Sequence, residues 1–234
     1  MCPEDLYKQL FPKENFNETP LLLNLIIYNH SEKYEQQMKS ILMPYLERIP
    51  NLTFYFISFR DQTKDIDVDE KEHMIWIKGI EGFIPGILKK TIEAMKLLRN
   101  KPYDYLIRSN ISTVFQWSNF PAEELQEHGY SSANVIYFIP NLPFGQGTNI
   151  ILRRDSSEYL IDNEKDIDWK IIDDVAIAQI LLPEYGIHAL DNPIEVNSEN
   201  PNSFVYRNKT DWNRDEDVAR MKKLVDLFMK KLDK

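Results

Sequence analysis

The segment from Tyr103 to Thr113, with the sequence Tyr-Asp-Tyr-Leu-Ile-Arg-Ser-Asn-Ile-Ser-Thr, constrains the fold more than any other segment. Apolar and aromatic residues lead into a strand, and the small polar residues that follow are typical of its carboxyl end. Open α/β sheets bind ligands at the carboxyl ends of their strands, because these ends present side chains and backbone groups to a crevice. The segment therefore predicts an α/β fold with a ligand site near residues 108–112.

Strand-like and helix-like patterns alternate along the first half of the chain. We expect strands at 21–28, 54–59, 74–77 and up to Ser109, helices at 32–46 and 86–99, and an acidic loop from Asp61 to Glu72. This order predicts a mixed, mostly parallel sheet flanked by helices, with right-handed crossovers.

The second half has a different pattern of elements. We expect strands at 135–139 and 149–152 around a loop at 143–147, a helix at 173–182, a short strand at 187–190 and a final helix at 215–232. No repeat, low-complexity tract or linker interrupts the chain, so we predict one domain over residues 1–234.

Composition and charge exclude several classes of protein. The chain has 234 residues, 43% of them hydrophobic, and a formal charge of −9. No block of Lys and Arg suggests a nucleic-acid partner. The apolar run from Leu21 to Tyr28 is too short to span a bilayer, and the first twenty residues contain no signal-peptide pattern. With Cys2 as the one cysteine, these features predict a cytoplasmic protein.

Four segments carry a resemblance to a known family. They are Gly86–Ile92, Tyr105–Thr113, Gly145–Asp155 and Asp173–Ala178, the last with the sequence Asp-Asp-Val-Ala-Ile-Ala. In order and spacing they resemble Fringe-like and galactosyltransferase-like glycosyltransferases of the A-type, Rossmann-like fold, over roughly residues 21–190. Soluble glycosyltransferase domains of large DNA viruses are similar. The resemblance implies a nucleotide-binding half at about 21–113, an acceptor and catalytic half at about 114–214, and a C-terminal helix at 215–232.

The sequence departs from the family pattern at the metal site. Relatives carry an Asp-x-Asp signature that holds a metal and a nucleotide-sugar diphosphate, and this chain has Asn110-Ile111-Ser112. Carboxylates supply the charge that makes Mg²⁺ or Mn²⁺ binding strong. No cofactor is therefore certain, and Asn110 and Ser112 would be the metal ligands if a metal bound. We expect weak or absent dependence on a divalent ion.

The acidic pair Asp173 and Asp174 matches the segment that supplies the catalytic carboxylate in relatives. An inverting sugar transfer needs a carboxylate to take the proton of the acceptor hydroxyl, and Asp174 matches that position. The alternative is that both acids only occupy a helix start, where the helix dipole favours negative charge.

Positive side chains must neutralise the diphosphate if no metal does. The candidates are Lys90, Arg108, Arg207 and Lys209, the last two in a basic loop that runs from Tyr206 to Arg214. Arg and Lys side chains suit phosphate groups. The alternative for each is a solvated surface charge. Side chains alternate between the two faces of a strand, so Arg108 could also point away from the site.

Two further pairs complete the predicted site. Tyr28 and Asn29, at the end of the first strand, would contact the nucleotide base or ribose, unless Asn29 only caps the following helix. Gly145 and Gly147 would let the backbone approach the sugar or the acceptor, unless they only form a tight turn.

The sequence favours a glycosyltransferase that moves a sugar from a nucleoside diphosphate sugar, such as a UDP-sugar, to a hydroxyl of a glycan or glycoprotein. A non-catalytic nucleotide- or sugar-binding module is the rival, because Asn110 and Ser112 replace both metal ligands. A nucleotidyltransferase is disfavoured because no Gly-rich basic loop follows the first strand.

Overall fold

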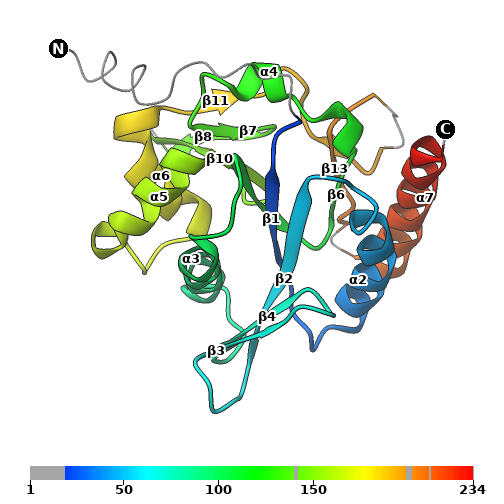
Figure 1. Cartoon of the computed structure of the whole chain (residues 1–234), viewed down its shortest axis with the longest axis horizontal. Helices are drawn as coiled ribbons and strands as arrows, with labels where there is room; N and C mark the ends of the chain where they lie inside the picture. Colours follow the sequence, from blue (N-terminus) through cyan, green and yellow to red (C-terminus); the bar gives the residue numbers. More distant parts are fainter. Residues whose placement is uncertain (1–18, 140–141, 199–201, 211, 234) are drawn as a thin grey trace.

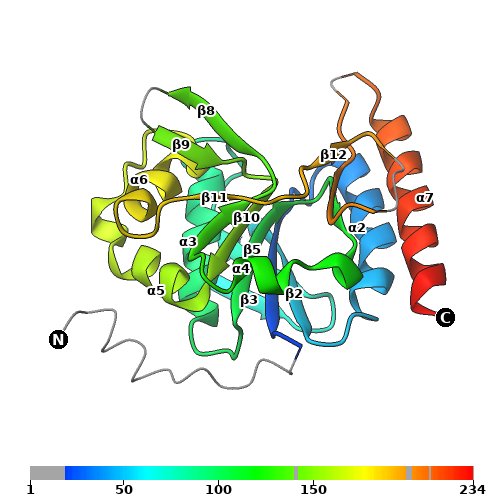
Figure 2. The same ribbon diagram turned by 90° about the horizontal axis from the view of Figure 1, so that it is seen from above.

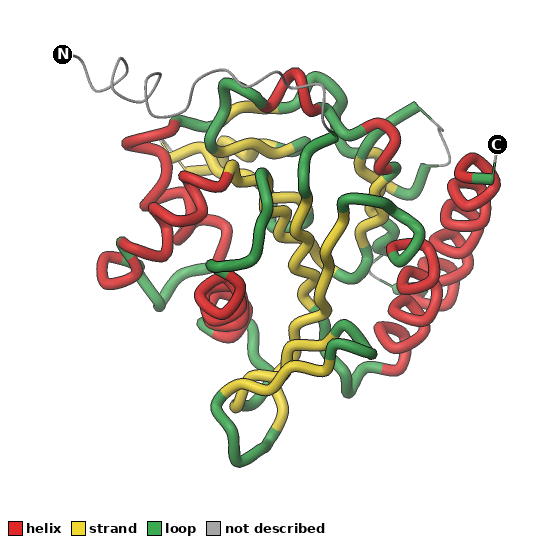
Figure 3. The backbone as a smooth tube through the Cα atoms, in the orientation of Figure 1, coloured by secondary structure: helices red, strands yellow, loops and turns green. Residues whose placement is uncertain are grey.

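An eight-stranded mixed sheet forms the centre of the molecule (Figures 1 and 3). The computed structural model describes residues 19–139, 142–198, 202–210 and 212–233, so Cys2 lies outside the described residues. In spatial order the strands are β11 (His188–Ala189), β7 (Tyr130–Ser132), β10 (Asn149–Arg153), β5 (Tyr105–Asn110), β1 (Leu22–Ile27), β2 (Leu52–Arg60), β4 (Met74–Lys78) and β3 (Ile66–Asp69).

The centre of the sheet is parallel and buried. Strand β1 pairs in parallel with both β2 and β5, so that Leu25 lies between Tyr55 and Arg108. All six residues of β1 are buried, as expected for a strand whose two faces are both covered by helices. Strand β10 joins β5 in the antiparallel direction. The predicted α/β fold with a mixed, mostly parallel sheet is confirmed.

Helices cover both faces of the sheet (Figure 1). One layer contains α2 (Lys33–Leu46) and α7 (Arg214–Leu232), and the other contains α3 (Gly86–Leu98), α5 (Arg154–Asp162) and α6 (Asp173–Tyr185). Helix α7 buries Met221, Leu224, Val225 and Phe228, which follow the helical repeat that the sequence predicts. Each such side chain stabilises the fold by roughly 1.5–3 kcal/mol when fully buried.

Two smaller sheets extend the central one at the carboxyl edge of its parallel strands. Strands β12 (Glu195–Val196), β13 (Val205–Arg207) and β6 (Thr113–Phe115) form one, and β8 (Val135–Ile139) with β9 (Leu142–Gly145) forms a hairpin (Figure 2). The short helix α4 (Ala122–Leu125) and two 3₁₀ turns, Trp117–Asn119 and Glu164–Asp166, complete the elements in the described residues. Among these residues, no helix combines the length and apolarity that a membrane span requires.

The prediction that residues 61–72 form a loop is wrong in its middle. Residues 66–69 form strand β3, which pairs with β4. Its sequence Ile-Asp-Val-Asp alternates apolar and acidic residues, and Ile66 and Val68 pack on the core. The surrounding charges hide this short alternation from a composition-based prediction.

The predicted loop at 143–147 and the segment after β10 also need correction. Leu142–Gly145 is strand β9, paired with β8, so the loop is confined to the residues after Gly145. Arg154–Asp162 is helix α5, which was not predicted because its apolar stripe is short. Only Leu160 and Ile161 supply buried apolar side chains from this helix, apart from the partly buried Tyr159.

Candidate active site at the carboxyl edge of the sheet

The carboxyl ends of β1 and β5 lie side by side. Ile27 pairs with Asn110, the last residue of β5. Strand β6 begins three residues later, at Thr113, and pairs with β13, so that Arg207 lies opposite Thr113. The fold therefore brings the predicted site segment and the basic loop to the same edge, although about one hundred residues separate them in sequence.

A carboxylate cluster, defined by Arg108, Gly147, Asp173 and Asp174, lies between β5, the segment after β9 and the start of α6. The guanidinium of Arg108 is 2% exposed and donates from Nη2 to Asp173 Oδ2 in a buried ion pair. Gly147 lies against the same guanidinium, and a side chain there would collide with Arg108 Nη1. Arg108 therefore points toward α6 rather than away from the site.

Asp174 is the accessible carboxylate of this cluster. It is partly exposed, and its two oxygens accept hydrogen bonds from the backbone N–H groups of Gly147 at 3.3 Å and Val175 at 3.0 Å. Burial, followed by the neighbouring Asp173, raises the pKa of Asp174, and Arg108 opposes the shift. A carboxylate with a raised pKa holds a proton more strongly, which suits a general base.

The segment between β5 and β6 is joined by a backbone contact to the residue that follows β13. The N–H of Asn208 donates to the carbonyl oxygen of Ser112 at 2.9 Å. Ser112 is buried and Asn110 is partly exposed at the end of β5. Thr113 Oγ1 donates to the Thr148 carbonyl at 3.2 Å, which ties this strand end to the segment that carries Gly147.

Asn208 is a candidate residue that sequence reasoning missed. Its side chain is fully buried, and neither Oδ1 nor Nδ2 has a hydrogen-bond partner among the described residues. An unpaired buried amide costs about 1–3 kcal/mol, and a functional role is one of the explanations for keeping such a group. The available signal was its place between Arg207 and Lys209.

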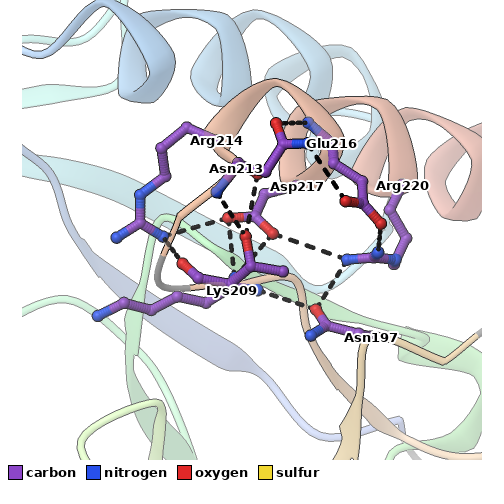
Figure 4. A network of polar contacts seen from close by, with 8 residues as sticks. Asn197, Lys209, Asn213, Arg214, Glu216, Asp217 and Arg220 are labelled. Atoms are coloured by element: carbon purple, nitrogen blue, oxygen red, sulfur yellow. Dashed lines mark hydrogen bonds and ion pairs between the residues drawn. The ribbon is translucent and has the colours of Figure 1, made fainter.

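The basic loop is held against the start of α7 by a buried carboxylate (Figure 4). Asp217 is 0% exposed and accepts hydrogen bonds from the Thr210 N–H at 2.8 and 3.0 Å and from Arg214 Nη1 at 3.1 Å. The N–H of Lys209 donates to Asn197 Oδ1 at 3.2 Å. Because Asp217 fixes the backbone at Thr210, the positions of Lys209 and its neighbours depend on α7.

Tyr28 and Asn29 follow β1, and the side chains of both make contacts within the fold. The ring of Tyr28 is buried against Phe56 in an edge-to-face contact with centroids 5.9 Å apart. Burial, followed by the charge of Glu35, raises the pKa of Tyr28 to about 12. Asn29 Oδ1 accepts hydrogen bonds from Ser31 N and Oγ at 3.1 and 2.9 Å. These bonds favour the alternative in which Asn29 stabilises the turn before α2.

Lys90 reaches the same edge from α3, where it meets carboxylate and carbonyl oxygens. Its Nζ is buried and donates to Glu81 Oε2 at 2.7 Å and to the Tyr28 carbonyl at 3.1 Å. Burial lowers the pKa of Lys90, against the ion pair with Glu81. Arg108 and Lys90, two of the four cations assigned to a diphosphate, thus already form ion pairs with carboxylates.

Gly145 belongs to the edge of strand β9. Its N–H donates to Tyr130 Oη at 2.8 Å, and an added Cβ would lie 2.8 Å from Ser132 Cβ. Close packing against β7 therefore explains this glycine, whereas Gly147 is explained by its contact with Arg108. Within the described ranges, no group of three or more His, Cys, Asp or Glu side chains is placed to hold a metal ion.

Solved structures resemble this fold. Two crystal structures of the glycosyltransferase GlyE from Streptococcus pneumoniae TIGR4 align with TM-scores of 0.50 and 0.51 and identities of 11% and 10%. The alignments cover 92% and 91% of this chain and 64% of GlyE, so this chain spans less than two thirds of that protein. The likeness shows the A-type glycosyltransferase fold.

A glycosyltransferase involved in the glycosylation of the major capsid of PBCV-1 aligns over its whole length and over 87% of this chain, at 11% identity and a TM-score of 0.49. The galactosyltransferase LgtC aligns at a TM-score of 0.48 and 11% identity, over 88% of this chain and 95% of LgtC. No protein-family model matches the sequence. No curated protein matches it either.

Proposed function

We propose that this protein is a glycosyltransferase that moves a sugar from a nucleoside diphosphate sugar, a UDP-sugar as first candidate, to a hydroxyl group of a glycan or glycoprotein. The A-type fold supports the reaction class. The position of Asp174 carries the proposal, since an accessible carboxylate with a raised pKa lies at the edge where this fold binds ligands. The cytoplasmic location expected from the sequence stays a prediction.

Asp174 takes the proton of the acceptor hydroxyl in this proposal, and the transfer inverts the anomeric centre. The backbone N–H groups of Gly147 and Val175 fix its two oxygens, so its position costs no reorganisation when the acceptor binds. Asp173 cannot share this role while Arg108 holds its carboxylate in a buried ion pair. Asp173 instead orients the start of α6 and, with it, Asp174.

The donor diphosphate lies, in this proposal, between Asn110, Ser112 and the basic loop. The backbone contact between Asn208 and Ser112 supports this placement. Arg207 and Lys209 are the chain neighbours of Asn208, so this contact holds them near Ser112. Charged hydrogen bonds to phosphate contribute roughly 1.5–3 kcal/mol each. In this proposal, Arg207 and Lys209 supply the positive charge that a metal ion held by two carboxylates would otherwise bring to the diphosphate.

The test compares Asp174→Asn with the parent protein in a transfer assay over a panel of nucleoside diphosphate sugars. Loss of a positioned general base lowers the rate by about 10²–10⁴-fold, and calorimetric UDP affinity should stay unchanged. Asp215→Asn is the matched control, because Asp215 is also in the first turn of a helix but is exposed on α7. Near-parent transfer by Asp174→Asn would show that the base lies elsewhere.

A binding module without catalysis is the second candidate. Two neutral residues stand at the metal-ligand positions, and no metal-binding group occurs in the described ranges. This reading predicts UDP or UDP-sugar binding by calorimetry, insensitive to Mn²⁺ and EDTA, with no turnover for any donor and acceptor. Turnover lost with Asp174→Asn would exclude it.

A further inference from the structure

The loop between β4 and α3 carries three exposed apolar side chains. Ile80 is 90% exposed, Phe83 65% and Ile84 44%; together they are termed the apolar tip. Single exposed apolar residues are common on protein surfaces, whereas several gathered on one short loop are typical of an interaction surface.

A buried contact holds the apolar tip outward. Between Ile80 and Phe83, Glu81 turns inward and accepts hydrogen bonds from Ser58 Oγ at 2.9 Å, the Phe59 N–H at 2.8 Å and Lys90 Nζ at 2.7 Å. These three bonds fix the middle of the loop on β2 and α3. Because these bonds hold the loop in place, the apolar side chains on either side of Glu81 face solvent.

The surface beneath the apolar tip is too small for a separate small-molecule site. A hollow of about 180 Å³ is lined by Phe59, Gly79, Ile80, Gly82, Ile84, Pro85, Gly86 and Lys89. Small-molecule sites usually have volumes of roughly 300–1,000 Å³. An extended partner that covers the apolar tip from outside fits this surface better.

The charges beside the apolar tip indicate what that partner is. Lys78 ends β4 and Lys89 lies in the first turn of α3, and both are exposed in a chain of net charge −9. Lysine side chains near an anionic lipid surface are attracted to it, and apolar side chains beside them can enter the headgroup region. The exposed Asp65, whose carbonyl accepts from the Lys78 N–H at 2.8 Å, weakens the local attraction. The apolar side chains must then supply most of the binding.

We propose that the apolar tip, with Lys78 and Lys89, inserts into the headgroup region of an anionic lipid bilayer. Strand β4 runs parallel to β2, which runs parallel to β1. The apolar tip therefore lies at the same edge of the sheet as Asn110. Bound in this way, the protein turns its candidate active site toward the lipid surface. The proposal does not depend on the proposed sugar transfer.

Co-sedimentation of the full chain with phosphatidylcholine vesicles, with and without phosphatidylglycerol, tests the proposal. The parent should bind the anionic vesicles more strongly, and added NaCl should weaken that binding. Replacing Ile80 and Phe83 together by Ser should lower the partition coefficient about tenfold or more. The pair Lys78→Gln and Lys89→Gln should lower binding to anionic vesicles only.

Leu97→Ser is the matched control, because Leu97 is 41% exposed at the other end of α3, and it should bind vesicles like the parent. Circular dichroism checks that each variant is folded. The proposal is overturned if the parent binds no vesicle, if it binds both kinds equally, or if the Ile80 and Phe83 variant binds like the parent. A concentration-dependent dimer in sedimentation velocity, lost in that variant and accompanied by no lipid binding, would assign the apolar tip to a second copy of the chain and overturn it as well.

Discussion

At the scale of single residues, the carboxylate cluster combines one guanidinium with two carboxylates. Arg108 forms its buried ion pair with Asp173, so Asp174 is left with two backbone N–H groups and a neighbouring negative charge. The raised pKa of Asp174 means that its ionisation opposes folding. A protein keeps such a group where its reactivity is useful, at the expense of some stability.

The first prediction concerns the pH dependence of this effect. The folded-state pKa of Asp174 is raised above the ordinary value of 3.8, so the folded chain binds more protons than the unfolded chain. Stability from this group is therefore lost as the pH rises from about 3.8 through the raised pKa. Asp174→Asn should raise the melting temperature at pH 7 and leave it unchanged below the ordinary pKa.

Differential scanning calorimetry of the parent and Asp174→Asn across this pH range measures the difference directly. Asp215→Asn, at an exposed helix start, should show no such trend. A melting temperature that falls on Asp174→Asn at pH 7 would mean that the ionised carboxylate stabilises the fold.

At the scale of elements, the pair Lys90 and Glu81 joins four of them. Lys90 Nζ binds the carbonyl after β1, and Glu81 binds the end of β2 and holds the loop that follows β4. Lys90 itself belongs to α3. The pair is buried at the lysine, which is 2% exposed, so removing one partner leaves an uncompensated charge.

The second prediction follows from that burial. Glu81→Ala should lower the free energy of unfolding by about 3–5 kcal/mol, the usual effect of breaking a buried ion pair. Lys222→Ala, which breaks an exposed pair with Asp226 on α7, should change it by only about 0–1 kcal/mol. Urea titration followed by circular dichroism measures both, and equal losses would show that water reaches the Lys90 pair.

At the scale of the whole molecule, one sheet separates two apolar cores. Helices α2 and α7 cover one core, and α3, α5 and α6 cover the other. Leu25 and Ile26, neighbours on β1, point into different cores. Loss of either core therefore exposes the same central strands and should remove the support of the other.

The third prediction is that both cores unfold together. Leu224→Ala, in α7, should lower stability by about 2–5 kcal/mol and shift the whole urea transition, whether followed by circular dichroism or by amide exchange. Amides of α3, on the opposite face, should lose protection at the same urea concentration as those of α7. Protection that persists in α3 after α7 has unfolded would show that the cores are independent.

Periodic apolar runs made the sheet predictable, and long-range polar contacts made the site only partly predictable. Strand β5 appears in the sequence as the continuous apolar run that contains Leu106 and Ile107, and helix α7 appears because Leu224 and Phe228 repeat with the helical period. Strand β3 was missed because four residues between acidic neighbours carry little apolar signal. No local pattern could show that Arg108 pairs with Asp173, since the partners are 65 residues apart.

The candidate site was likewise only partly predictable from the sequence. Arg207 and Lys209 were assigned to the diphosphate from their charge; the register of β13 with β6 places Arg207 opposite Thr113, and the diphosphate contact stays a prediction. Tyr28 was assigned to the nucleotide from its position; its ring packs on Phe56, and a nucleotide contact stays a prediction. Burial of a side chain at a strand end depends on which way the chain turns next, and sequence spacing does not specify that turn.

The ladder between β5 and β10 has a mechanical consequence. Ser109 pairs with Asn149 and Tyr105 with Arg153 across the line where the two halves of the sequence meet. A hinge along that line would break the backbone pairs that hold the sheet together. The floor of the candidate site is therefore stiff, so a ligand of the kind proposed above would have to enter by motion at its rim. The turn at Gly147 and the loop held by Asp217 are the segments whose stiffness would set how fast ligands enter and leave.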